Sequence, residues 1–135
     1  MIVFFDTSAF YALSNATDSK HQEAVRAWES LSPDRDCRFV TTNYVAVEVA
    51  TLLQRRRGMS AVRDFVDFMH ANVEITYIEP AIHNLALAEC LHENRRDVSL
   101  VDHVSFAFMQ RHGIRAAFAF DEHFVERGFK LPSLR

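Results

Sequence analysis

Apolar residues along the chain form short continuous runs that alternate with stripes at helical spacing. Residues 2–5 and 116–120 are uninterrupted apolar runs, which are typical of strands buried on both faces of a sheet. Two further strands are predicted at 38–41 and 73–78, and a last strand at the edge of the sheet at 129–131. The pattern therefore predicts four strands, with a fifth at one edge.

Between these runs, apolar residues recur every three or four positions, as they do on one face of an amphipathic helix. Six helices are predicted, at 9–13, 19–31, 42–57, 60–69, 80–92 and 99–112. The expected N-caps are Ser19 for the second, Thr42 or Asn43 for the third and Ser99 for the last, and Pro80 opens the fifth. Strands that alternate with helices indicate an α/β fold. We expect a single domain over residues 1–135, in which helices flank a mostly parallel central sheet of four to five strands.

The composition limits how this domain could bind its partners. The 135 residues carry a formal net charge of −3, which excludes binding to nucleic acid through bulk positive charge. No segment is predicted to cross a membrane, because the opening apolar run is cut by Asp6. Cys37 and Cys90 are far apart and lack metal-ligand spacing, so we expect two reduced thiols in a cytoplasmic protein.

Four acidic residues occupy positions that a hydrophobic core does not favour. Asp6 and Asp121 each follow a predicted buried strand directly, and parallel strands would bring both to one edge of the sheet. Glu48 lies on the inward stripe of its helix, and Asp102 lies in the most apolar helix of the chain. Buried carboxylates repel one another and lose hydration, unless they share a positive charge. A shared Mg²⁺ or Mn²⁺ ion would resolve this conflict, and such an ion suits hydrolysis of a phosphodiester bond by water.

Each acid also has a purely structural interpretation. Asp6 and Asp121 could form turns or cap helices. Glu48 could pair with a buried arginine. Asp102 would be the third residue of a helix capped by Ser99, an arrangement that helices favour in any protein.

Four segments around these acids, taken in order and with their spacing, resemble the PIN-domain family. They are Val3 to Ala9, Asn43 to Ala50, Leu100 to Asp102 and Ala119 to Phe124. The similarity covers essentially the whole chain and is strongest to VapC-type toxins of bacterial toxin–antitoxin pairs. It implies endoribonuclease activity on tRNA or another structured RNA, a homodimer, and a small VapB-type antitoxin.

The resemblance also implies roles for individual residues. Four acids would form the metal site for Mg²⁺ or Mn²⁺ and carry the reaction: Asp6, Glu48, Asp102 and Asp121. Thr7 or Ser8 would orient a ligand or a water molecule beside Asp6. Ser99 would be a partner of the residues that hold the metal, without binding it directly.

Other features leave alternatives open. Arg55, Arg56 and Arg57 could contact RNA, or could simply be cations at the carboxyl end of a helix. The seven histidines keep open a metal-free ribonuclease, although only His123 lies near a proposed site residue. The alternative to an enzyme is a catalytically inert PIN-like domain that serves as a protein-interaction module.

Overall fold

A computed structural model describes residues 1–131, and its centre is a four-stranded sheet. The strands are β1 (Ile2–Phe5), β2 (Arg38–Thr42), β3 (Glu74–Thr76) and β4 (Ala116–Phe118). They are all parallel and lie in the order β3-β2-β1-β4. Val3 of β1 is opposite Phe39 on one side and Ala116 on the other. The predicted α/β class and parallel sheet are confirmed.

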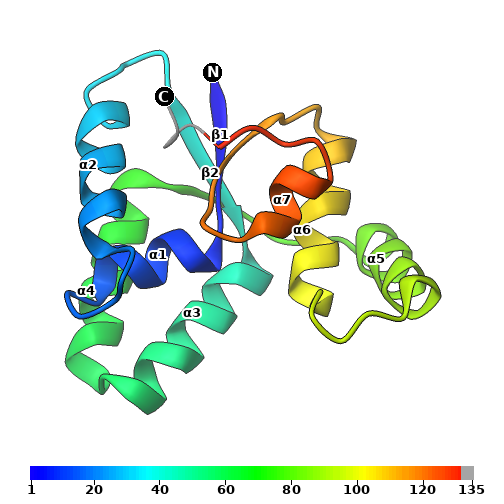
Figure 1. Ribbon diagram of the computed structural model, residues 1–135, viewed down its shortest axis with the longest axis horizontal. Coiled ribbons are helices and arrows are strands. Elements are labelled where there is room, and N and C mark those ends of the chain that lie inside the picture. Colours follow the sequence, from blue (N-terminus) through cyan, green and yellow to red (C-terminus); the bar gives the residue numbers. More distant parts are fainter. Residues whose placement is uncertain (132–135) are drawn as a thin grey trace.

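Helices cover both faces of this sheet. They are α1 (Thr7–Ser14), α2 (His21–Leu31), α3 (Asn43–Arg56), α4 (Met59–Asn72), α5 (Pro80–Glu93), α6 (Leu100–Arg111) and α7 (Glu122–Glu126). In Figure 1, α2 and α4 lie on one side of the strands, whereas α6 and α7 lie on the other, with α5 outside α6. Helix α3 crosses beneath the carboxyl ends of β1 and β2, where parallel sheets place their binding sites.

The core is largely aromatic and is divided by the sheet. Neighbouring residues in a strand point to opposite faces, so Phe4 and Phe5 enter different layers. The ring of Phe5 stacks on Phe10 with centroids 4.1 Å apart and lies 4.9 Å from Phe118. On the other face, Phe4 lies 5.9 Å from Phe108 of α6. All of β1 beyond Ile2 is fully buried, as its continuous apolar run predicts.

Several predicted boundaries are wrong at the ends of elements. Ser19 does not cap α2: that helix begins at His21, because the Asp18 carboxylate accepts a hydrogen bond from the Lys20 N–H (2.8 Å) and tightens the preceding turn. The strand predicted at 73–78 shrinks to the three residues of β3, since Val73 still ends α4. The helix predicted from Ser60 begins one residue earlier, at Met59.

The carboxyl-terminal part of the chain differs most from the prediction. The strand predicted at 129–131 is reduced to one isolated bridge between Ala116 and Lys130, so the described sheet has four strands. Strand β4 ends at Phe118, where the carbonyl accepts a hydrogen bond from the Asp6 N–H (3.1 Å). Helix α7 was not predicted at all. None of the helices between residues 1 and 131 combines the length and apolarity needed to span a bilayer.

Candidate active site

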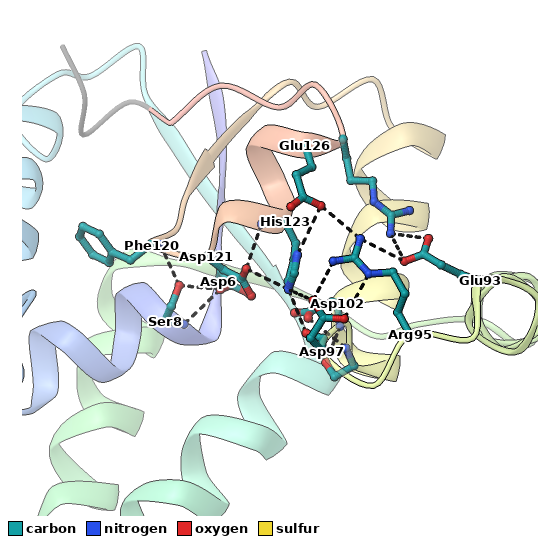
Figure 2. A network of polar contacts seen from close by, with 12 residues as sticks. Asp6, Ser8, Glu93, Arg95, Asp97, Asp102, Phe120, Asp121, His123 and Glu126 are labelled. Atoms are coloured by element: carbon teal, nitrogen blue, oxygen red, sulfur yellow. Dashed lines mark hydrogen bonds and ion pairs between the residues drawn. The ribbon is translucent and has the colours of Figure 1, made fainter.

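Two of the four acids meet where β1 and β4 end. These strands are adjacent and parallel, so Asp6 and Asp121 leave the sheet at the same edge. The Ser8 hydroxyl joins the two chain segments, because it donates to Asp6 Oδ2 (2.7 Å) and accepts from the Phe120 N–H (2.9 Å). Figure 2 shows Ser8 between Asp6 and the end of β4. The small polar residue beside Asp6 thus fixes the orientation of its carboxylate.

The three aspartates all cap helices, so the structural interpretation of each holds. Asp6 Oδ2 accepts from the Ser8 N–H at the start of α1 (3.1 Å), and Asp121 Oδ1 accepts from the His123 N–H at the start of α7 (2.9 Å). Asp102 and Ser99 form a reciprocal capping box on α6, with bonds of 3.0 and 3.1 Å. Each carboxylate therefore anchors one oxygen to local backbone and leaves the second oxygen for other partners.

All four acids line one cavity of about 440 Å³. Its walls come from the starts of α1, α6 and α7, from the middle of α3, and from the turn before α2. The lining residues are Asp6, Thr7, Ser8, Tyr11, Asp18, Ser19, Lys20, Glu48, Leu52, Ser99, Asp102, Phe120 and Asp121. The fold thus brings together acids that are up to 115 positions apart in the sequence, the separation of Asp6 and Asp121.

The acids are close enough to perturb one another. Burial raises the pKa of Asp6 to about 7, and the charges of Asp102 and Asp121 add to this rise, whereas hydrogen bonds from Ser8 oppose it. Burial also raises the pKa of Asp102 to about 6, with contributions from Asp121 and Glu48. A cation in the cavity would remove this repulsion, since an opposite charge favours the ionised form of a carboxylate.

One oxygen of the cluster is buried without a hydrogen-bond partner in the described part of the chain. Asp6 is only 3% exposed, and its Oδ1 makes no hydrogen bond to any residue from 1 to 131. Such an atom costs free energy in a folded protein unless an ion or another ligand engages it. The Glu48 carboxylate, which is half-buried, likewise makes no hydrogen bond or ion pair among residues 1–131, so it does not pair with a buried arginine.

The donor set suits a hard divalent cation, since all four side chains offer carboxylate oxygens. Within residues 1–131, however, no three Asp, Glu, His or Cys side chains lie close enough to hold a metal ion as they stand. Three of the carboxylates are held apart by their separate helix caps. Convergence on one ion would require rotation about these anchors, or movement of Glu48.

The three consecutive arginines do not form one patch. The guanidinium of Arg56 lies over the Tyr11 ring, 5.8 Å from its centroid, and Tyr11 lines the acidic cavity. Arg55 lines a neighbouring groove, whereas Arg57 lines a separate hollow between α1 and α4. Arg56 therefore lies beside the acidic cavity through Tyr11, whereas Arg55 lies in the groove that shares Glu48 with this cavity.

A network of ion pairs closes the other side of the site (Figure 2). Arg95 binds Asp97 (2.7 Å) and Glu126 (3.3 Å). Both of these acids flank His123, whose Nε2 lies 3.7 Å from Asp121 Oδ1 and 2.9 Å from the Asp97 carbonyl. Burial lowers the pKa of His123, but these neighbours outweigh that effect, so the pKa is raised above its usual value. The loop before α6 is thereby tied to α7.

Sequence reasoning missed several residues of the cavity. None of Tyr11, Asp18 and Lys20 was among the predicted site residues, yet all three line the cavity. No local signal marks them, because their position depends on how the turn between α1 and α2 returns to the edge of the sheet.

Comparison with known proteins shows the family of this chain. The family model described as PIN domain matches residues 3–130. The chain belongs to the PIN domain family. This PIN domain is 36% identical over 129 residues to the 23S rRNA-specific endonuclease VapC20 of Mycobacterium tuberculosis, in each of two strains, with 95% of both chains covered.

A solved structure extends the likeness to three dimensions. The crystal structure of M. tuberculosis VapC20, described as a Sarcin–Ricin loop cleaving toxin, matches this PIN domain with a TM-score of 0.84. The two chains are 35% identical and 96% of each is covered. These matches confirm the predicted family and fold, including the resemblance to VapC-type toxins.

Proposed function

We propose that this PIN domain is a divalent-metal-dependent endoribonuclease that acts as the toxin of a VapBC-type pair. The observation that carries the proposal is the single cavity lined by four acids from separate segments. In this cavity a buried oxygen of Asp6 has no hydrogen-bond partner among the described residues. Membership of the PIN family and the likeness to an endonuclease over 95% of the chain support the same conclusion.

In this proposal Asp6, Glu48, Asp102 and Asp121 would hold Mg²⁺ or Mn²⁺. The bound ion would activate a water molecule and neutralise charge on the phosphate that is attacked. The protein's own contribution is to hold the acids in place: Ser8 orients Asp6 by two hydrogen bonds, and Ser99 anchors Asp102 to the start of α6. Thr7, whose buried hydroxyl has no hydrogen-bond partner within residues 1–131, is available to a ligand in the same cavity.

The substrate we propose is a structured RNA. The relative VapC20 is named for action on 23S rRNA, and its structure for cleavage of the Sarcin–Ricin loop, so a ribosomal stem-loop is the first substrate to test, with tRNA as the second. The chain as a whole has a net charge of −3 and does not attract RNA. Arg56 above Tyr11 supplies a local positive charge beside the acids. The likeness to VapC-type toxins supports three further parts of the proposal: a cytoplasmic location, a small VapB-type antitoxin and a homodimer.

The alternative is an inert PIN-like interaction module. A module has no need for buried acids that repel one another. The raised pKa values of Asp6 and Asp102 show that ionising these two carboxylates costs free energy in the folded chain. Substituting either acid in such a module should leave its function intact.

The decisive experiment is a cleavage assay with purified protein on ribosomal RNA and tRNA. We expect cleavage with Mg²⁺ or Mn²⁺, silence in EDTA, and restoration by added Mn²⁺. Asp6→Asn and Asp102→Asn should abolish cleavage and still fold, whereas Asp67→Asn, which alters an exposed acid on α4, should remain active. Cleavage that resists EDTA would favour the histidine mechanism, and full activity of Asp6→Asn would refute the proposed site.

A further inference from the structure

A second hollow adjoins the acidic cavity along α3. This groove has a volume of about 630 Å³ and shares two wall residues, Glu48 and Leu52, with the acidic cavity. Its other walls are mainly apolar, and they include Val47, which is 64% exposed, and Val101 at the start of α6. The groove therefore lies next to the place where a ligand would lie across the acids.

Tyr44 provides the groove with a fixed aromatic ring. Its hydroxyl is hydrogen-bonded to Nδ1 of His83 on α5, and its ring packs against the small cluster formed by Ile82, Ala86 and Val104 with Ala107. Tyr44 stands one helical turn before Glu48, so both lie on the same face of α3. The ring is thus positioned beside the acids before any ligand binds.

Arg55 marks the far end of the same face. It lines the groove, and within residues 1–131 it makes no hydrogen bond or ion pair, which leaves its guanidinium available to an anion. Tyr44 and Arg55 are separated by about 16 Å along the helix axis at the usual rise. The order along α3 is therefore an aromatic ring, an acid of the proposed metal site, and an unpaired cation.

This order matches the chemistry of a nucleotide chain, in which flat apolar bases alternate with anionic phosphates. On the basis of the endoribonuclease function proposed above, we propose that the groove binds an unpaired nucleobase adjacent to the cleaved phosphate. Tyr44 is the surface on which this base stacks, and Arg55 contacts a flanking phosphate. Tyr44 would act as a binding and specificity residue, not as a catalytic one.

A cycle that combines protein and RNA changes tests this inference. The probe is a synthetic RNA stem-loop that spans the mapped cleavage position, with and without an abasic nucleotide beside the cut. In the wild type, the abasic change should raise KM by roughly 5- to 150-fold, the usual effect of losing one stacked base, with little change in kcat. Tyr44→Ala should raise KM for intact RNA by a similar factor. Tyr44→Ala tested on abasic RNA should raise KM no further than either change alone.

Matched variants separate stacking from other effects. Tyr44→Phe keeps the ring and should stay close to wild type, whereas Tyr77→Ala removes an exposed tyrosine that does not line the groove and should have no effect. Arg55→Ala should raise KM and weaken the salt dependence, in contrast to Arg63→Ala on α4. The abasic comparison uses the unaltered protein, so it tests the inference even where a variant does not fold.

Each outcome has a distinct meaning. Additive effects of Tyr44→Ala and the abasic nucleotide would overturn the inference while leaving the endoribonuclease function intact. An unchanged KM of the wild type for the abasic RNA would also overturn the inference. So would a Val47→Asp variant that changes the sedimentation coefficient and leaves KM unchanged, because a second copy of the chain would then occupy the groove. Failure of the wild type to cleave any RNA would refute the proposed function and this inference with it.

Discussion

Replacing Asp6 with asparagine should make the protein more stable at pH 8, even as cleavage is lost. Burial and neighbouring acids raise the pKa of Asp6 from 3.8 to about 7 in the folded chain. Because the folded pKa is the higher one, the ionised form opposes folding: its cost is absent below about pH 4 and complete above about pH 7. A shift of this size corresponds to about 4 kcal/mol.

Asparagine recovers only part of that cost. Its side-chain oxygen can still accept the hydrogen bond from the Ser8 N–H, as an N-cap residue should. Its amide nitrogen, however, would occupy one of two positions. One is the buried position of Oδ1, which has no hydrogen-bond partner among residues 1–131, and the other is the position that faces Ser8. An unsatisfied buried group costs about 1–3 kcal/mol, so we expect a net gain of about 1–3 kcal/mol at pH 8.

Urea denaturation at several pH values measures this effect. The difference between Asp6→Asn and wild type should grow by about 3 kcal/mol between pH 4.5 and pH 8. Asp67→Asn, on the exposed face of α4, should show no such growth. Mn²⁺ should stabilise the wild type by about 2.7 kcal/mol at a hundredfold excess over Kd, but not Asp6→Asn. A difference that is independent of pH would refute the electrostatic account of the site.

Three further substitutions test how the site is held. Ser8→Ala should lower the free energy of unfolding by about 1–2 kcal/mol, as measured by urea denaturation. It should also move the acid limb of the pH–rate profile to higher pH, because the Ser8 hydrogen bonds lower the pKa of Asp6. An acid limb that does not move would contradict this role. Arg56→Ala removes the cation above Tyr11 and should reduce the salt slope of RNA binding by about one, which filter binding measures. Ser99→Ala should cost about 1 kcal/mol through loss of the cap, with a lower kcat.

The sequence predicts the frame of the fold because its strands and caps are local features. Continuous apolar runs identify the central strands, and Thr42 and Ser99 cap the helices assigned to them. Helix α7 escapes prediction because five residues are too few to show a helical period. The strand expected at 129–131 keeps a single bridge at Lys130, since pairing at a sheet edge depends on contacts distant in sequence.

The candidate site divides in the same way. Parallel topology alone brings Asp6 and Asp121 to one edge, so their proximity follows once two buried strands are recognised. Tyr11 and Lys20 could not be predicted, because they reach the cavity through a turn whose path is set by tertiary packing. The sequence left open whether the three arginines contact RNA. Successive residues on a helix point about 100° apart, so Arg55 and Arg56 face different hollows.

Capping and ligand binding are compatible roles for the same aspartates. Each of the three uses one oxygen to satisfy a backbone N–H at the start of a helix, where the positive end of the helix dipole offsets part of the charge. The second oxygen is then held near the cavity by the same hydrogen bond that caps the helix. Asparagine can serve as a cap as well as aspartate does, so Asp→Asn removes the charge and retains the anchor. Loss of activity in such variants therefore reports on the carboxylate itself, not on the helix that it caps.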